Sequence, residues 1–392
     1  MNNPDIATKA PVNSGLEGVV AAETSLSMVD GARGELVIAG YPVGELALNG
    51  TFEQTVWLLW HGALPSAEEL QSFRADLASR RALPPAALEL LRAAAAAPVD
   101  GMDALRIAAG TVSLRRRGGS SDGDDARDLV AVFPTIVATW WRRLHGHEPI
   151  APQAELGHAA NYLYMLTGQT PAEERVRGLE TYLNTVVDHG LNASTFTARV
   201  ITSTGSDLVS AIVGAIGALK GPLHGGAPGP ALDMVFEIGD AARAEEVLRR
   251  KIEAGEKLMG FGHRVYKVRD PRADVLNVAT ERLFARGGDR KLYELARAVE
   301  ETALRLLAEY KPGRNLQTNV EFYTALLLHG LDLEVPLFTP TFAVSRVAGW
   351  LAHAFEQRKT NRIIRPQRVS VGPPPKSWDG RKLEPPVSVE KG

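Results

Sequence analysis

Three of the nine histidines have unusual neighbours, which include glycine: His189 in D-H-G, His224 in L-H-G-G and His263 in G-F-G-H. Glycine has no Cβ, so backbone N–H groups and a ligand can come close to the neighbouring side chain. These segments also precede expected helix starts, where the helix dipole disfavours an imidazolium. Each histidine alone could be a turn or core residue. Three together favour a site with neutral histidines that donate hydrogen bonds.

A basic segment follows His263. Four cations fall within residues 264–272, directly beside the glycine-rich turn. Arginine and lysine at this density can hold phosphates or carboxylates. The alternative interpretation is a solvated, basic helix start with Asp270 as its N-cap.

Arg346 interrupts the apolar run of residues 342–350. An arginine on an apolar helix needs an anion, because a buried and unpaired charge is costly. The partner is either a ligand carboxylate or a structural glutamate such as Glu356.

The composition excludes several classes of function. With 44 basic and 46 acidic side chains the net charge is −2, which argues against a general binder of nucleic acid or of anionic membranes. The chain contains no cysteine, so disulfides, thiolate catalysis and Cys-ligated metals are excluded. The run H-G-H-E at residues 145–148 has metal-type ligands but no further cluster, so we expect a loop there and no metal.

The length and the apolar content describe a large globular protein. The chain has 392 residues, 45% of them apolar, which is enough for a sizeable core and for two or three domains, or one large domain with a satellite. Residues 1–15 lack the apolar core of a secretory signal, and no uninterrupted apolar run approaches the roughly 20 residues of a membrane span. We expect a cytoplasmic protein.

Helical periodicity dominates the chain. Thr51 with Gln54, and Ser66 with Glu69, predict capping boxes that start two helices. Apolar residues at helical spacing predict further helices over 176–186, 292–306 and 342–357.

Extended structure is expected mainly near the N-terminus. Residues 18–24 and 35–39 are predicted as two short extended segments joined through the turn pair Asp30-Gly31. Few other windows alternate, so we predict an all-α fold. Prolines at 373–375 and 385–386 cannot continue a helix and predict an extended, Pro-rich tail.

Several blocks together resemble the citrate synthase family. The string G-F-G-H-R-V-Y-K-V-R-D-P-R at 260–272 is similar to the signature of that family. Further similar blocks are G-L-E-G-V-V-A-A-E-T at 15–24, L-N-A-S-T-F-T-A-R-V at 191–200, G-A-L-K-G-P-L-H-G-G-A at 217–227, N-V-E-F-Y at 319–323 and the run from Phe338 through Arg365-Pro366. The blocks occur in order, at family-like spacing, from about residue 15 to 372.

The resemblance implies a fold and an activity. The fold is an all-α homodimer with the site in a cleft between two domains: a large domain from 1–225 and 335–392, and a smaller, mobile domain from 226–334. The activity is condensation of acetyl-CoA with oxaloacetate, as in the tricarboxylic acid cycle, followed by hydrolysis of the citryl thioester. The coenzyme A thioester is a substrate, and no cofactor is implied.

The resemblance also assigns roles to residues. His224 would donate to the thioester oxygen, Glu321 would take the methyl proton, and His263 would polarise the ketone. His189, His263, Arg272 and Arg346 match the binders of oxaloacetate, and Arg365 matches an arginine that the other subunit supplies. Lys267 falls where a cation faces a phosphate of coenzyme A, and Gly260, Phe261 and Gly262 would border the adenine.

The chain departs from the family pattern near the site. Glu321 stands where most members have aspartate, Gly190 replaces a common glutamate, and the segment 227–230 (A-P-G-P) replaces a usual Asn-Glu pair. One extra methylene moves the carboxylate by about 1.5 Å, and a misplacement near 1 Å can cost ~10²-fold in rate. Two alternatives therefore stay open: a 2-methylcitrate synthase that uses propionyl-CoA, and a weakly active paralogue that binds its ligands for regulation.

Overall fold

The computed structural model describes residues 13–115, 121–225, 228–286, 289–369, 371 and 377–379. The chain forms two compact units, Thr24–Ile363 and a second unit composed of Met1–Glu23 with Ile364–Gly392. The prolines at 373–375 and 385–386, on which the predicted extended tail rests, lie outside the described residues. The blocks that resemble the citrate synthase family fall in the unit Thr24–Ile363, except for residues 15–23 of the first block and the residues after 363 of the last block.

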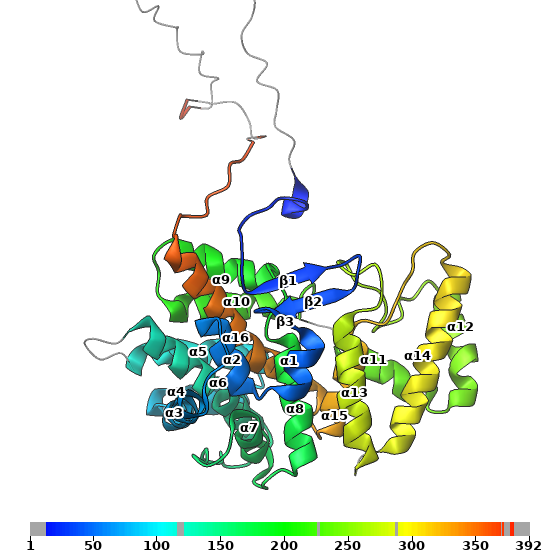
Figure 1. The fold of residues 1–392 in the computed structure, drawn as a ribbon, viewed down its shortest axis with the longest axis horizontal. Helices are drawn as coiled ribbons and strands as arrows, with labels where there is room; N and C mark the ends of the chain where they lie inside the picture. Colours follow the sequence, from blue (N-terminus) through cyan, green and yellow to red (C-terminus); the bar gives the residue numbers. More distant parts are fainter. Residues whose placement is uncertain are drawn as a thin grey trace, which may run out of the picture. The chain divides into compact units, whose positions relative to one another are not determined.

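The unit Thr24–Ile363 is built almost entirely from helices (Figure 1). The prediction of an all-α fold is confirmed. The helices are α1 (Val43–Asn49), α2 (Phe52–His61), α3 (Ala67–Ser79), α4 (Pro85–Ala96), α5 (Gly101–Ala109), α6 (Asp122–Leu144), α7 (His158–Thr167), α8 (Glu173–Val186), α9 (Ala193–Ser203), α10 (Leu208–Lys220), α11 (Pro228–Ile238), α12 (Ala244–Glu253), α13 (Pro271–Ala285), α14 (Arg290–Tyr310), α15 (Val320–Gly330) and α16 (Phe338–Lys359).

The helix starts follow the predicted capping. Thr51 accepts a hydrogen bond from Gln54 N at 3.4 Å, and the Gln54 side chain accepts one from Thr51 N at 2.8 Å. Ser66 and Glu69 form the same reciprocal pair at the start of α3. The helices predicted over 176–186, 292–306 and 342–357 are α8, α14 and α16.

One small antiparallel sheet precedes the helices. Strands β1 (Ser27–Asp30), β2 (Glu35–Ile38) and β3 (Tyr41–Pro42) lie in the order β1-β2-β3, with Asp30 opposite Glu35. The prediction that 18–24 forms the first extended segment of this hairpin is wrong. The Asp30 side chain accepts from the backbone of residues 32 and 33, and this tight turn fixes the register, so the strand that pairs must immediately precede it.

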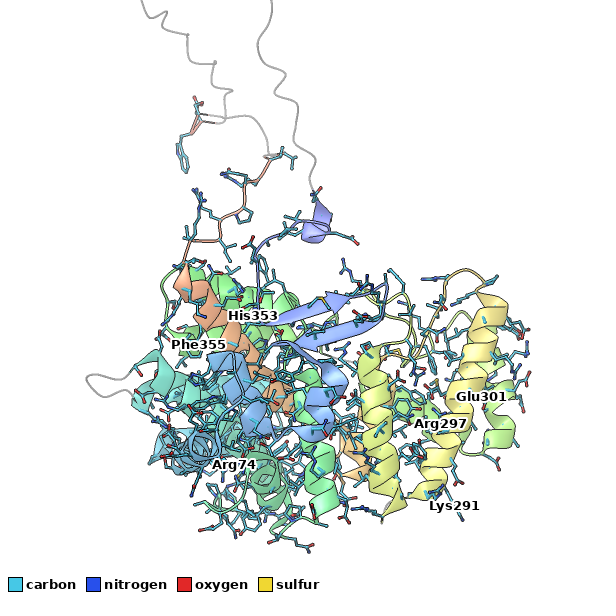
Figure 2. All side chains as sticks on the ribbon, viewed as in Figure 1. Arg74, Lys291, Arg297, Glu301, His353 and Phe355 are labelled. Atoms are coloured by element: carbon cyan, nitrogen blue, oxygen red, sulfur yellow. The ribbon has the colours of Figure 1, made fainter. Side chains whose placement is uncertain are left out.

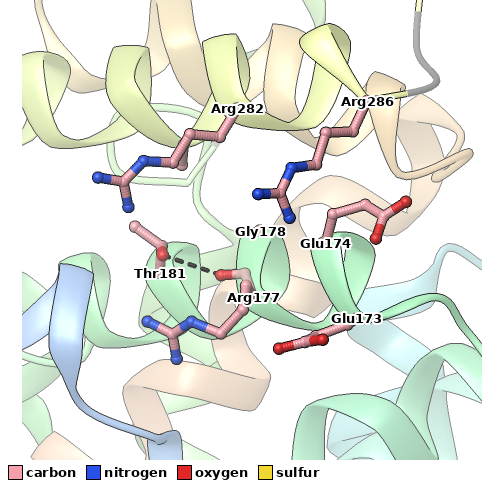
Figure 3. A pocket seen from close by; sticks show the side chains of 8 residues that line it. Glu173, Glu174, Arg177, Gly178, Thr181, Arg282 and Arg286 are labelled. Carbon is pink, nitrogen blue, oxygen red and sulfur yellow. Dashed lines mark hydrogen bonds between the residues drawn. The ribbon is translucent and has the colours of Figure 1, made fainter.

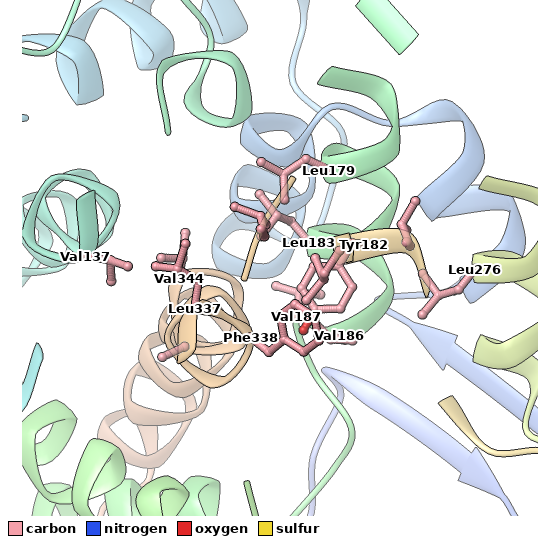
Figure 4. Close-up of a cluster of buried hydrophobic side chains, with 14 of the residues drawn as sticks. Val137, Leu179, Tyr182, Leu183, Val186, Val187, Leu276, Leu337, Phe338 and Val344 are labelled. Carbon is pink, nitrogen blue, oxygen red and sulfur yellow. The ribbon is translucent and has the colours of Figure 1, made fainter. Parts of the chain in front are cut away.

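The core of the unit surrounds α16. Trp350, Val344 and Phe338 of this helix are at most 2% exposed. Figure 4 shows Val344 and Phe338 beside Tyr182 and Leu183 of α8. The helix therefore runs through the apolar interior, and any polar group on it requires a partner.

The predicted small domain, 226–334, corresponds to α11–α15, which gather on one side of the unit in Figure 1. These helices cluster into one compact unit with the rest of Thr24–Ile363, and the division into a large and a small domain stays a prediction. Among the described helices, none is long and apolar enough to cross a membrane.

Candidate active site

Two of the three glycine-flanked histidines lie close together. His189 follows the C-terminal end of α8, and His263 lies in the turn before α13, yet their ring centroids are only 5.9 Å apart. Tyr266 lies beside both rings, and its hydroxyl is 3.0 Å from His189 Nε2. Burial, followed by Arg272 and Arg346, lowers the pKa of His189 well below its usual value, so this ring is neutral.

The hydrogen bonds of His263 fix its tautomer. Its Nδ1 accepts from the backbone N–H groups of Val265 and Tyr266, at 3.0 and 3.1 Å. The proton of the neutral ring must therefore be on Nε2. Burial, and then Arg272, lower the pKa of His263 to about 4, so His263 is a neutral donor at physiological pH.

Arg272 is the cation next to that donor. It is buried on the first turn of α13, where the Asp270 carboxylate accepts from its Nε at 3.0 Å and from its Nη2 at 2.8 Å. The same carboxylate accepts from Val320 N at 3.2 Å, which connects α13 to the start of α15. Arg272 Nη2 lies 3.3 Å from His263 Nε2. Both atoms carry hydrogen, so a shared acceptor must come from a ligand.

Arg346 is the second buried cation and is 2% exposed. Its Nε donates to the Val186 carbonyl at 2.7 Å, and its guanidinium lies 4.5 Å from the centroid of the Phe342 ring. Burial lowers the pKa of Arg346 to about 10, so it remains charged. Within the described part of the chain no carboxylate forms an ion pair with it.

The suggestion that Glu356 pairs with Arg346 is wrong. Glu356 accepts from Arg199 at 2.7 Å instead, because it lies almost three turns further along α16, out of reach of residue 346. The charge of Asp188 acts on Arg346 without forming an ion pair with it, and a ligand carboxylate as its partner stays a prediction.

His224, which follows α10, belongs to the same region because it lines a cavity with Val186 and Phe342, the two residues that Arg346 contacts. Its Nε2 lies 2.8 Å from the Ser194 hydroxyl and 3.3 Å from Ser194 N. A backbone N–H can only donate, so Nε2 accepts and the proton of the ring is on Nδ1. Trp350 Nε1 donates to the same hydroxyl at 3.1 Å. Burial, with a smaller effect of Arg346, lowers the pKa of His224 to about 4.

Glu321 and His224 line one small cavity. Glu321 lies in the first turn of α15, where its N–H donates to the Asn319 side chain at 3.0 Å. The cavity has a volume of about 60 Å³, and its other walls are mainly apolar. These walls are Tyr182, Val186, Leu219, Gly225, Val320, Thr324, Phe338, Thr339 and Phe342. Burial raises the pKa of Glu321, which strengthens the carboxylate as a base.

The segment Gly260–Gly262 holds the start of α15 in place. Both glycines have positive φ, 87° and 83°. Asn319 N donates to the Gly260 carbonyl at 2.9 Å, and the Asn319 side chain donates to the Gly262 carbonyl at 2.8 Å. A Cβ at Gly260 would lie 2.9 Å from Phe322 Cβ. Glycine here thus allows the signature segment to pack directly against the helix that carries Glu321.

Not every predicted residue joins this cluster. Lys267 is exposed, and its Nζ donates to the Arg264 carbonyl at 3.1 Å, with donors left for an anion. Arg365 belongs to the other compact unit, so its role stays a prediction.

Sequence reasoning missed Ser194, Tyr266 and Trp350. Ser194 and Tyr266 lie inside the blocks 191–200 and 260–272, which resemble the family. Their position in these blocks is the signal that could have identified them. Trp350 ends the apolar run of residues 342–350, and only its contact with Ser194 shows that it also supports His224.

A larger groove elsewhere lacks this chemistry. It has a volume of about 290 Å³ and lies between α8 and α13, with Arg282 and Arg286 of α13 opposite Glu173, Glu174 and Arg177 of α8 (Figure 3). It holds no histidine and no buried base, so its greater volume does not make it the reaction site. Among the described residues no group of three or more His, Cys, Asp or Glu side chains could hold a metal ion.

Comparisons with known proteins agree with this geometry. The family model described as "Citrate synthase, C-terminal domain" matches residues 15–367. The chain is 41% identical to citrate synthase of Haloferax volcanii, over 91% of this chain and 95% of that protein. It is 39% identical to 2-methylcitrate synthase of Mycobacterium tuberculosis, over 95% and 93%. The crystal structure of citrate synthase from Pyrobaculum aerophilum superposes with a TM-score of 0.85, at 37% identity and 96% coverage of both chains.

Sequence similarity, the fold and the geometry of the candidate site support the same family assignment. The family match spans the whole of the helical unit, and two of the three residues predicted to be catalytic, His224 and Glu321, line one cavity. This chain belongs to the citrate synthase family.

Proposed function

We propose that the protein condenses acetyl-CoA with oxaloacetate and hydrolyses the citryl thioester to citrate and coenzyme A. The observation that carries the proposal is the cavity shared by His224 and Glu321, next to two buried arginines. A neutral donor, a carboxylate with a raised pKa and fixed cations are the groups that this reaction needs. The relatives named citrate synthase support it.

The first step is removal of a methyl proton. Glu321 takes the proton from the carbon next to the thioester, and the electron pair moves onto the thioester oxygen. His224 Nδ1–H donates to that oxygen, since Nε2 is occupied by Ser194. The donor is needed because a proton beside a thioester is very weakly acidic.

The second step forms the carbon–carbon bond. The enolate carbon attacks the ketone carbon of oxaloacetate, whose oxygen accepts a hydrogen bond from His263 Nε2–H. That oxygen takes up one proton to become the hydroxyl, and Glu321 releases the proton that it took from the methyl group. His189, Arg272 and Arg346 bind the two carboxylates, which supply the anion that Arg346 lacks. Water then adds to the thioester carbonyl, and coenzyme A leaves as the thiol. Lys267 and Gly260–Gly262 contact the coenzyme.

A release assay for free coenzyme A with oxaloacetate tests this function. We expect saturable turnover with acetyl-CoA. No release under saturating conditions would refute it and favour the paralogue that only binds.

Propionyl-CoA is the second candidate acyl donor. The cavity walls beside Glu321 are mainly apolar, and an apolar pocket discriminates one methyl group by only ~1–3 kcal/mol. The relative named 2-methylcitrate synthase supports this alternative. Comparison of kcat/KM for the two thioesters decides between them.

The protein also acts as a homodimer, in which Arg365 completes the site of the other subunit. The resemblance supports this arrangement, and mixing two variants tests it. Glu321→Gln and Arg365→Ala should each be inactive. After mixed refolding, a heterodimer has one intact site, so roughly a quarter of the wild-type activity should return. No recovery would place Arg365 in its own subunit's site, and an active Arg365→Ala variant would place it outside any site.

A further inference from the structure

One face of α16 lies against the chain segment that leads into His189. Arg346 donates to a carbonyl of segment 186–188, and His353 Nε2 lies 3.1 Å from the Asp188 carboxylate. Between them, Gly349 packs so closely that a Cβ would clash with the carbonyl oxygen of residue 187. These three α16 residues are spaced by three and four positions, so they share one face of the helix.

His353 connects Asp188 to a buried arginine. Arg199 Nη1 lies 3.1 Å from His353 Nδ1, and a guanidinium has no acceptor. His353 Nδ1 therefore accepts, and its Nε2–H donates to Asp188. Both partners of this hydrogen bond are 0% exposed. Figure 2 labels His353 on α16.

Arg199, at the other end of this series of hydrogen bonds, has its charge neutralised by a carboxylate. Arg199, which is 4% exposed, donates to Glu356 at 2.7 Å and to Gln357 at 3.1 Å. The charge of Asp188 is thus balanced through His353 by an arginine on the side away from the ligand pocket.

The other oxygen of Asp188 is held as well. It accepts from the Ser27 hydroxyl at 2.5 Å and from Gly190 N at 3.3 Å. Burial raises the pKa of Asp188, but His353 and Arg346 reverse this effect and lower it below its usual value. Asp188 is therefore a buried carboxylate, and its orientation fixes the position of the adjacent His189 backbone.

We propose that His353 is a positioning residue: by donating to Asp188 it fixes the backbone around His189 and keeps the Asp188 charge turned away from the incoming keto diacid. His353 does not touch substrate. It acts through Asp188 on His189 and Arg346. The inference deepens the proposed function and rests on it for the identity of the ligand.

Two amide variants separate the two hydrogen bonds of His353. In His353→Gln the amide nitrogen can occupy the place of Nε2 and still donate to Asp188. In His353→Asn the shorter amide can reach only Arg199. The matched control is His329→Gln on α15, whose ring contacts Phe236 at 5.3 Å and none of the site residues.

We expect His353→Asn to raise the KM for oxaloacetate about 10- to 100-fold, because displacements near 1 Å have effects of this size. The KM for the acyl-CoA should change less than about twofold. His353→Gln should restore the oxaloacetate KM to within about threefold, and His329→Gln should behave as wild type. An unchanged oxaloacetate KM in His353→Asn would overturn the proposal. So would an equal loss in both amide variants that follows their thermal stability.

A second measurement does not depend on turnover. Imidazole ¹⁵N NMR of the resting enzyme should show His353 protonated on Nε2 and bare on Nδ1. A proton on Nδ1 would overturn the proposal even in an active enzyme. If the wild type released no coenzyme A while His353 showed the expected tautomer, the proposed function would fail. The hydrogen bonds from Arg199 through His353 to Asp188 would still be supported.

Discussion

At the scale of single residues, the environment of each titratable group sets its role. Burial lowers the pKa of His224 and His263 to about 4 and raises the pKa of Glu321. The imidazoles therefore stay neutral donors, while the carboxylate holds a proton more readily than an ordinary glutamate. Enolate chemistry requires one carboxylate base and fixed hydrogen-bond donors, and Glu321 and the two neutral imidazoles match these requirements.

Removal of the base should abolish condensation. We expect Glu321→Gln to lower kcat by at least about 10³-fold, because no other described carboxylate lines the cavity with His224. The variant should still bind oxaloacetate, since the arginines are intact. A variant that keeps near-full turnover in the coenzyme A release assay would contradict the assignment.

The side-chain length of the base at position 321 can be tested separately. Glu321→Asp withdraws the carboxylate by about 1.5 Å, and we expect a loss of roughly 10²-fold in kcat. Tritium exchange from the methyl group of acetyl-CoA isolates the proton transfer. Faster exchange in the aspartate variant would show that the native base is poorly placed.

The pH dependence of kcat/KM should have an acid limb set by Glu321. The base must be ionised, and its pKa lies above the usual 4.5, so activity should rise with pH through a value higher than that. The imidazolium forms of His224 and His263 lose one proton near pH 4, so above that pH both rings are neutral donors and contribute no limb. An acid limb centred below pH 4.5 would be inconsistent with a buried base at position 321.

At the scale of elements, two contacts place the catalytic groups. Asn319 caps α15 and is bonded to the carbonyls of Gly260 and Gly262, and Asp270 links α13 to the start of α15. The signature segment and the helix of the base therefore move as one piece. A perturbation of either should reach the active site.

Gly260→Ala tests this coupling. The new Cβ would meet Phe322 at 2.9 Å and would also have to adopt φ of 87°. We expect about 2–4 kcal/mol of destabilisation by urea denaturation, from a strained φ together with overpacking, and a lower kcat.

Gly313→Ala is the matched control, because its φ is 83° but nothing lies within 4 Å of its Cβ. It should lose only about 1–2 kcal/mol and keep its kcat. Equal effects of the two substitutions would show that packing against α15 is unimportant.

At the scale of the whole molecule, a buried carboxylate remote from the chemistry affects stability. Glu180 on α8 is 7% exposed, near the buried Glu53. Burial, and then Glu53, raise the pKa of Glu180 to about 7, against the opposing effect of Arg177. Because the folded-state pKa exceeds the unfolded one, its contribution is fully present below pH 4.5 and is lost as the pH rises through 7.

Glu180→Gln should remove this pH dependence. Gln cannot ionise but keeps an acceptor for Arg177, which bonds Glu180 at 2.5 Å. From pH 5 to pH 8 the wild type should lose up to about 3 kcal/mol from this group, and the variant should not. Urea unfolding at several pH values measures the difference. Parallel profiles for the two proteins would show that Glu180 is ionised in the folded state throughout.

The sequence by itself determined the helical class and the capped helix starts, and it predicted the residues of the candidate active site. Local signals carry these features: apolar spacing for the helices, Thr51 and Ser66 for their caps, and contiguous blocks for His224, His263 and Glu321. A glycine flanking a histidine is visible without any coordinates.

Only the tertiary structure decided how those residues are supported. The tautomer of His224, the contact of Trp350 with Ser194 and the hydrogen bonds from Arg199 through His353 to Asp188 all depend on segments far apart in the chain. The pairing of Glu356 with Arg199 instead of Arg346, and the placement of the first strand at β1, were decided in the same way. Hydrogen bonds and burial depend on distances in space, and apolar spacing along one segment carries no information about which distant segment packs against it.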